Sequence, residues 1–154
     1  MRLWQSRESQ RRGQNGVQQE RSLEIPKQFT DAMVQHAQEE DPNECCGLLA
    51  GKNGRVMRHY RITNAEKSPY RYSMDGKELL AAYNEIEDDD LEVQVIYHSH
   101  THSPAYPSNT DVRLATWPDA YYLLVSLMDK AAPDIRMFSI ADGKVHEEPV
   151  VVTA

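Results

Sequence analysis

The chain has 154 residues, of which 40 % are hydrophobic and 27 % are charged, and its formal net charge is −7. This length suits one domain with a real core, and the composition is that of a globular protein. No apolar run approaches the roughly 20 residues that a membrane-spanning helix needs, and the acidic balance argues against nucleic acid as the main partner.

Residues 1–22 differ in composition from the rest of the chain. They are rich in Gln, Arg, Ser and Gly, and five Arg against two Glu give them a charge of +3, which leaves −10 for the remainder. Such a segment cannot bury enough surface to offset its ordering entropy, so we expect a flexible N-terminal extension at 1–22 and one folded domain at 23–154. No apolar h-region of a secretory signal is present, so we expect a cytoplasmic protein.

The first half of the domain predicts a helix and then a β-hairpin. Apolar positions recur every four residues after Pro26, which predicts an amphipathic helix that begins there. This helix should end before Pro42, because a proline disfavours the helical conformation of the residue before it. The apolar run CCGLLAG, the turn sequence KNGR and the segment 56–63 then predict two strands joined by an Asn-Gly turn.

The second half predicts alternating helices and strands, followed by a run of strands. Strands are predicted at 70–74 and 92–98, and helices at 76–88 and 108–116, from the spacing of apolar residues. The segments YYLLVSLM, IRMFSIA and VHEEPVVV predict three further strands, with ADGK as a hairpin turn. We therefore expect the α/β class, with a mixed β-sheet flanked by helices.

Three residues in the stretch VIYHSHTHSPAYPSNTD have the pattern of metal ligands. His98 and His100 end a predicted strand, and side chains two residues apart point to the same face of a strand. Asp111 follows eleven residues after His100, beyond a loop that can fold it back. Two imidazoles and one carboxylate suit catalytic zinc, because they leave a fourth position for water.

Hydrolysis also needs a base and a group that stabilises the oxyanion. Glu44, directly before a buried strand, is the best candidate for the base, and Ser108 could donate a hydrogen bond to a developing oxyanion. Each residue also has a simpler interpretation. A His-x-His pair alone is usually an exposed polar strand end, Glu44 alone a solvated loop residue, and Ser108 with Asp111 a helix capping box.

The remaining candidate side chains predict no second site. Cys45 and Cys46 are adjacent, so a disulfide between them would be strained, and we expect free thiols in a reducing compartment. Two cysteines without a second pair do not make a structural zinc site. His102 is interpreted as a residue of the pocket wall or of the surface.

The joint pattern resembles a known family. Glu44 in ECCGLLAG, then HSH, a seven-residue gap, Ser108, two residues and Asp111 fill every position of the JAMM (MPN-plus) metalloprotease signature. The resemblance covers roughly residues 23–152 and implies a mixed sheet flanked by helices, related to the cytidine deaminase architecture. It also implies His98, His100 and Asp111 as zinc ligands, Glu44 as the general base, and Ser108 as a residue that stabilises the oxyanion.

A narrower resemblance links the chain to the bacterial branch named Mec. The segments TNAEKSPYRYSMD, VIYHSHTHSPAYPSNTDVRLATWPDAYYLLVS and GKVHEEPV carry it. It implies hydrolysis of the bond between the C-terminal Gly-Gly of a ubiquitin-like sulfur-carrier protein and cysteine, and so a role in cysteine biosynthesis. The implied partner is that carrier, with neither nucleic acid nor membrane, and exposed sheet edges are compatible with a homodimer.

Other interpretations make different demands on the sequence. A non-catalytic MPN scaffold has no physical need for all five signature residues. A zinc deaminase would need a Pro-Cys-x-x-Cys segment, which this sequence lacks. A JAMM deubiquitinase-like peptidase with another substrate remains the alternative within the family, although the chain has no room for long insertions.

Overall fold

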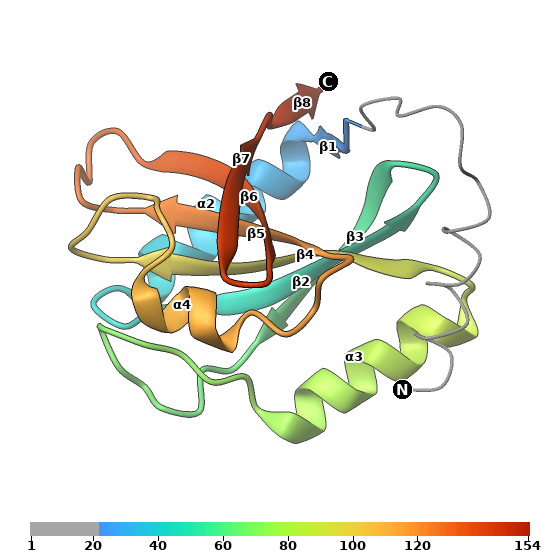
Figure 1. Ribbon diagram of the computed structural model, residues 1–154, viewed down its shortest axis with the longest axis horizontal. Helices are drawn as coiled ribbons and strands as arrows, with labels where there is room; N and C mark the ends of the chain where they lie inside the picture. Colours follow the sequence, from blue (N-terminus) through green and yellow to red (C-terminus); the bar gives the residue numbers. More distant parts are fainter. Residues whose placement is uncertain (1–21) are drawn as a thin grey trace.

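A mixed β-sheet of eight strands forms the centre of the computed structural model, which describes residues 22–154 (Figure 1). The predicted extension at 1–22 lies outside the described residues, except for Ser22. In order across the sheet, the strands are β7 (Lys144–Glu148), β6 (Asp134–Ala141), β5 (Tyr121–Ser126), β4 (Glu92–His100), β2 (Cys46–Lys52), β3 (Arg55–Ile62), β1 (Glu24–Pro26) and β8 (Val151–Thr153).

The sheet contains both parallel and antiparallel pairs of strands. Strands β4 and β5 are parallel, and so are the pairs β1–β3 and β1–β8. The other neighbouring pairs are antiparallel. Two hairpin turns are tight, and each has two residues with positive φ, Asn53 with Gly54 and Asp142 with Gly143. This conformation is typical of type I′ turns, as the sequences KNGR and ADGK predict.

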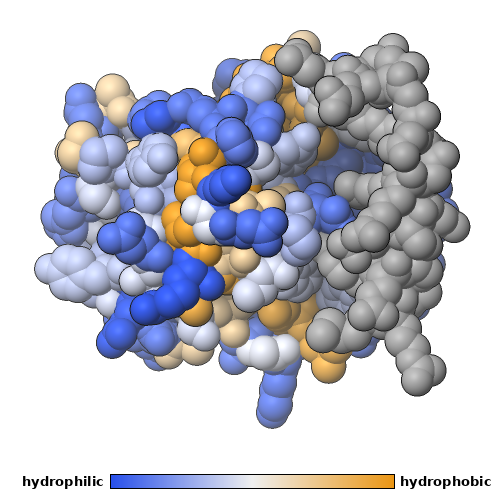
Figure 2. Space-filling view, viewed as in Figure 1, coloured by the Kyte–Doolittle hydropathy of each residue, from blue (hydrophilic) through white to orange (hydrophobic). Residues whose placement is uncertain are grey.

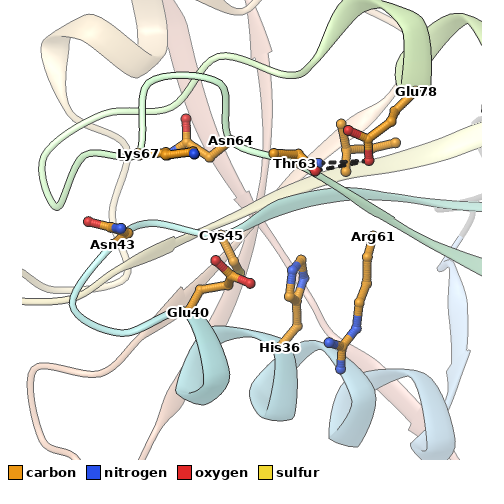
Figure 3. Close-up of a pocket in the computed structure, with 10 residues that line it drawn as sticks. His36, Glu40, Asn43, Cys45, Arg61, Thr63, Asn64, Lys67 and Glu78 are labelled. Carbon is orange, nitrogen blue, oxygen red and sulfur yellow. Dashed lines mark hydrogen bonds between the residues drawn. The ribbon is translucent and has the colours of Figure 1, made fainter.

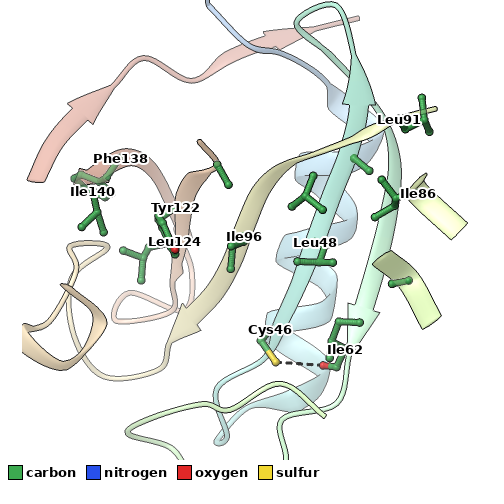
Figure 4. Packing of buried hydrophobic residues seen from close by; sticks show 14 of the residues in the cluster. Cys46, Leu48, Ile62, Ile86, Leu91, Ile96, Tyr122, Leu124, Phe138 and Ile140 are labelled. Atoms are coloured by element: carbon green, nitrogen blue, oxygen red, sulfur yellow. Dashed lines mark hydrogen bonds between the residues drawn. The ribbon is translucent and has the colours of Figure 1, made fainter. Parts of the chain in front are cut away.

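Helices cover both faces of the sheet. Helix α2 (Lys27–Glu40) packs on one face, where Met33 and Ala37 contact a cluster that includes Leu49. Helices α3 (Gly76–Asp88) and α4 (Asn109–Leu114) lie on the other face. There, Ile86 belongs to a cluster with Leu48 (Figure 4). Because neighbouring strand residues point to opposite faces, Leu48 belongs to the cluster under α3 and Leu49 belongs to the cluster under α2. The predicted mixed sheet flanked by helices is confirmed.

Two of the strand predictions are wrong. Residues 70–74 form an irregular loop with a single β-bridge, between Asn64 and Met74, because the backbone of this segment bonds to the Asn64 side chain instead of to a strand. The segment VHEEPVVV is two strands, β7 and β8, at opposite ends of the sheet order. Pro149 separates them, since proline has no N–H to donate to a strand ladder.

The helix boundaries differ from the sequence predictions at two places. The predicted helix at 76–88 is observed with the same bounds, but Pro26 ends β1 and precedes α2 instead of beginning the helix. Helix α4 is shorter than the predicted 108–116. None of the helices among residues 22–154 is both long and apolar enough to cross a membrane. The face seen in Figure 2 is predominantly hydrophilic, with small apolar patches.

Candidate metal centre and active site

Strand β4 brings His98 and His100 together at its end. Both side chains are buried, and their Nε2 atoms lie 3.3 Å apart. They share a face because they are two residues apart on an extended strand. The Nδ1 of His100 lies 2.8 Å from the carbonyl oxygen of Pro104. A carbonyl only accepts, so Nδ1 carries a proton, and Nε2 presents its lone pair to the cluster whenever the ring is neutral.

The first turn of α4 supplies the third member of the cluster. Asp111 Oδ2 lies 3.1 Å from His98 Nε2 and 3.0 Å from His100 Nε2. Ser108 fixes this position through a capping box: Asp111 N donates to Ser108 Oγ (3.0 Å), and Ser108 N donates to Asp111 Oδ2 (2.9 Å). The capping interpretation of Ser108 is therefore confirmed, and the cap orients the carboxylate toward the two imidazoles.

The geometry of these three side chains fits a small divalent cation. Their candidate ligand atoms all lie within 4.8 Å of one another. Ligands about 2.0–2.1 Å from a tetrahedral zinc ion are themselves about 3.3 Å apart, close to the 3.0–3.3 Å separations found here. Two imidazole nitrogens and one carboxylate oxygen are also the donor set of many zinc hydrolases. The cluster is thus a candidate metal centre.

The antiparallel register of β2 and β4 explains the place of Glu44. Cys46 pairs with His98, so the same register continued by two residues sets Glu44 opposite His100, on the same face. The Glu44 side chain is only 4 % exposed, and its Oε1 is buried without a hydrogen-bond partner among the described residues. A buried carboxyl oxygen that lacks a partner is costly in a folded protein, and it marks Glu44 as a functional candidate.

Burial and neighbouring charges set the protonation of the site. Burial raises the pKa of Glu44 to about 8, with the charges of His100 and Asp111 acting on it in opposite directions. Burial lowers the pKa of His98 and so favours a neutral ring. For Asp111, burial acts against the charged form, but hydrogen bonds from His100 and His98 hold its pKa well below the usual range. Burial lowers the pKa of His100, but its hydrogen bonds to Asp111 and Pro104 outweigh burial and raise it, so metal binding would have to displace a proton from this ring.

Sequence reasoning missed three residues that hold this site together. Ser99 Oγ accepts a hydrogen bond from Cys45 N (2.7 Å), which fastens the His-x-His strand to the segment of Glu44. The Tyr72 ring stacks on His98, with centroids 4.5 Å apart and planes at 27°. Asn64 bonds to Glu44 and to the loop that carries Tyr72. The segment TNAEKSPYRYSMD contains two of them, but no motif spacing indicated their roles.

Comparison with known proteins places this sequence in a family. Residues 26–141 match the family described as prokaryotic homologues of the JAB domain, which is three quarters of the chain. The chain belongs to this family. The predicted JAMM resemblance is thereby confirmed at the level of the family.

Relatives and solved structures agree with this membership. The JAB-domain chain is 50 % identical over 132 residues to the CysO-cysteine peptidase of Mycobacterium tuberculosis, which covers 84 % of this chain and 90 % of that protein. It is 37 % identical over 98 residues to a desampylase of Pyrococcus furiosus, covering 63 % and 69 %. A solution structure of a Desulfitobacterium hafniense protein matches with 35 % identity and a TM-score of 0.77, covering 84 % and 92 %. A JAB1/MPN domain protein from Archaeoglobus fulgidus shares the fold at 17 % identity and a TM-score of 0.58, covering 85 % and 99 %.

A polar cavity of 270 Å³ near the start of β2 contains none of the predicted site residues of this JAB-domain protein (Figure 3). Cys45 lines it, and burial raises the pKa of this thiol to about 12, so Cys45 is not an activated nucleophile. Cys45 and Cys46 are both free, as predicted, and both are buried. His102 is exposed and bonds to Thr101 Oγ1, outside the metal cluster, as the surface interpretation predicts.

Proposed function

We propose that this protein is a zinc-dependent JAMM-type peptidase that cleaves the bond between the C-terminal Gly-Gly of a ubiquitin-like sulfur-carrier protein and cysteine. The observation that carries the proposal is the cluster of His98, His100 and Asp111 beside the unpartnered carboxyl of Glu44. The relationship to a CysO-cysteine peptidase at 50 % identity supports the choice of substrate.

The proposed metal site uses one atom from each of three residues. His98 Nε2, His100 Nε2 and Asp111 Oδ2 would hold Zn²⁺, and the buried cluster offers no thiolate that would favour a purely structural site. When bound, the cation supplies Lewis-acid polarisation of the scissile carbonyl and makes the attacking water more acidic.

Glu44 is proposed to move the proton. Its Oε1 takes a proton from the attacking water and then donates it to the amine nitrogen of cysteine as the C–N bond breaks. A pKa raised to about 8 by burial suits this role, because both protonation states are accessible near neutral pH. The carrier leaves with a free carboxylate, and the cysteine leaves with an amino group.

Ser108 is proposed to stabilise the oxyanion. Its Oγ accepts from Asp111 N, which leaves the hydroxyl proton to be donated to the carbonyl oxygen of the substrate. Capping and oxyanion stabilisation are therefore compatible in one side chain. One such donor lowers the activation barrier by roughly 3 kcal/mol in other hydrolases.

The setting of the reaction is part of the same proposal. The substrate is a protein conjugate, so we expect a carrier with a flexible, glycine-ended tail as partner, and neither nucleic acid nor membrane. The two free thiols, Cys45 and Cys46, favour a reducing, cytoplasmic compartment. Strands β7 and β8 end the sheet order, and such edges are compatible with a homodimer.

The test is hydrolysis of a carrier–cysteine conjugate, read as the mass of the carrier, with and without a chelator. Wild-type protein should release cysteine only when metal is present. Glu44→Gln should abolish turnover and still bind zinc. Normal hydrolysis by this variant would refute Glu44 as the base, whereas a wild-type protein that binds zinc but cleaves no conjugate would favour a scaffold.

A further inference from the structure

A cavity of 310 Å³ lies directly beside the candidate metal centre, and Asp111 is part of its wall. Unlike the polar cavity in Figure 3, it is largely apolar. Residues of the sheet, of the loop at 70–74, of α3 and of α4 with the segment after it line this open cavity. Its apolar lining includes Leu48, Met74, Leu79, Ile96, Trp117 and Tyr122.

One cationic side chain, Arg71, is found among the described residues that line this cavity. Its guanidinium is 71 % exposed and pairs with Glu66 through Nε at 2.9 Å. An ion pair this exposed contributes little to stability. A guanidinium carries further N–H donors on its two terminal nitrogens, and these match a carboxylate bidentately.

The backbone at Arg71 is well fixed, although the side chain is exposed. The buried Asn64 donates through Nδ2 to the carbonyl of Arg71 (3.1 Å), and its Oδ1 accepts from the N–H groups of Glu66 (3.0 Å) and Ser73 (3.1 Å). These bonds hold Arg71 and its partner Glu66 in one rigid loop, next to the site. Because this backbone is already fixed, binding would not have to order the loop.

The proposed conjugate has one group that calls for a cation at this place. Cysteine joined to the carrier through its amino group keeps a free α-carboxylate on the leaving side of the scissile bond. The tail of the carrier has no such group, because its terminal carboxyl is the carbonyl under attack. A cationic side chain beside the candidate metal centre therefore suits the α-carboxylate on the leaving side of the scissile bond.

We infer that the cavity lined by Arg71 and Asp111 is the subsite of the leaving amino acid, with Arg71 binding its α-carboxylate. The inference rests on the proposed function and deepens it, because it makes the enzyme selective for a single terminal residue. A conjugate through a lysine side chain places no α-carboxylate next to Arg71. Neither does a conjugate in which further residues follow the leaving amino acid. The apolar walls contact the side chain of the leaving residue.

The test uses one carrier in two chemical forms. The CysO protein of Mycobacterium tuberculosis is prepared with an additional C-terminal cysteine, and separately with a C-terminal cysteinamide, which lacks the negative charge. Hydrolysis of both by the full chain, loaded with zinc, is followed by mass. Wild-type enzyme should prefer the carboxylate form by roughly tenfold or more in kcat/KM, the loss expected for one charge-assisted contact.

Two arginine variants complete the experiment. Arg71→Gln should cleave the two forms at similar rates, through a raised KM for the carboxylate form alone. Arg113→Gln, which removes the same charge from an exposed position of α4 outside the cavity lining, should keep the wild-type preference. Loss of the preference in both variants would indicate a general field effect and overturn the assignment of Arg71.

The remaining outcomes separate the subsite from the function. Equal cleavage of both forms by wild-type enzyme would overturn the subsite and leave the peptidase intact. An equal loss on both substrates in Arg71→Gln would show that this side chain serves the carrier tail or the loop. Cleavage of neither form by wild-type enzyme would refute the proposed function itself, and the subsite with it.

Discussion

Asn64 donates a hydrogen bond through Nδ2 to the backbone carbonyl of Glu44, with 3.0 Å between the two atoms. The bond is buried, and the same amide group also binds the loop at 71–73. That loop carries Tyr72, whose ring stacks on His98. One side chain thus connects the candidate base with the residue that covers a candidate ligand.

Asn64→Asp should lower kcat even under conditions in which the variant is fully folded. Aspartate keeps both acceptor bonds to the loop but cannot donate to the carbonyl groups of Glu44 and Arg71, so the base loses its support and the loop loses one bond. We expect kcat to fall by about 10–100-fold, the effect of a small displacement of a reacting group. Asn64→Ala should also cost roughly 2–4 kcal/mol of unfolding free energy, because buried groups lose partners. Steady-state kinetics and thermal unfolding distinguish the two effects, and an unchanged kcat in Asn64→Asp would contradict a positioning role.

Asp111→Asn should remove metal binding without disrupting α4. The asparagine oxygen can still accept from Ser108 N, so the capping box persists. The loss of the anionic ligand should weaken zinc binding by more than about 100-fold, beyond the 10–100-fold typical of outer-shell changes. Isothermal titration with zinc measures this directly.

Zinc should also stabilise the wild-type protein. Stabilisation by a ligand that binds only the folded state is about 2.7 kcal/mol at a free concentration 100 times Kd. The melting temperature of the wild-type protein should therefore rise with zinc and fall with chelator, while that of Asp111→Asn stays constant. A similar rise in both proteins would mean that zinc binds elsewhere.

Substitutions at Ser108 should separate capping from catalysis. Ser108→Gly should cost only a few tenths of a kcal/mol in stability, because glycine is tolerated at a helix N-cap. It removes the hydroxyl, so kcat should fall by about 100- to 1,000-fold if that group stabilises the oxyanion. Ser108→Thr keeps both functions and should retain most of the activity. A glycine variant with wild-type kcat would restrict Ser108 to capping.

A hydrogen-bonded triad of two buried residues and the partly buried His59 should make the fold sensitive to acid. His36 Nδ1 and His59 Nε2 each lie 2.6 Å from the hydroxyl of Tyr97, between α2 and the sheet. Burial lowers the pKa of both histidines to about 4, and the nearby charge of Arg61 acts in the same direction, while Glu39 opposes it for His36. Both rings therefore remain neutral in the folded protein at a pH where the unfolded chain is protonated.

The sign of the pH effect follows from these lowered pKa values. Stability is complete above pH 6.5 and is lost as pH falls toward about 4, by up to about 1.4 kcal/mol per pH unit for each imidazole. His36→Gln should reduce this slope, and His146→Gln, at an exposed position, should leave it unchanged. Urea unfolding between pH 4 and pH 7 provides the measurement, and equal slopes in all three proteins would contradict the assignment.

Local sequence signals predicted the elements that depend on local physics. The helix at 76–88 follows from its apolar spacing, and the turns at Asn53–Gly54 and Asp142–Gly143 follow from their need for positive φ. The pairing of His98 with His100 follows from strand geometry, and the position of Asp111 follows from the capping box with Ser108.

The features that were missed depend on contacts between distant segments. Strand β1 has three residues, and its partners β3 and β8 lie far along the chain, so no local pattern indicates it. Tyr72 and Asn64 act through a loop with no periodic pattern, and the alternation at 70–74 indicated a strand instead. The burial of Glu44 depends on the register of β2 against β4, which is a property of the folded sheet.

The pairing of β1 with β8 has a consequence for biosynthesis. Glu24 pairs with Val151, so this edge of the sheet closes only after all of the residues between them have been translated. Such long-range pairing is slow to form, and unpaired strand edges are prone to associate with other chains. The candidate centre, between Glu44 and Asp111, leaves the ribosome well before β8. A nascent chain therefore displays the candidate metal ligands before their scaffold is finished.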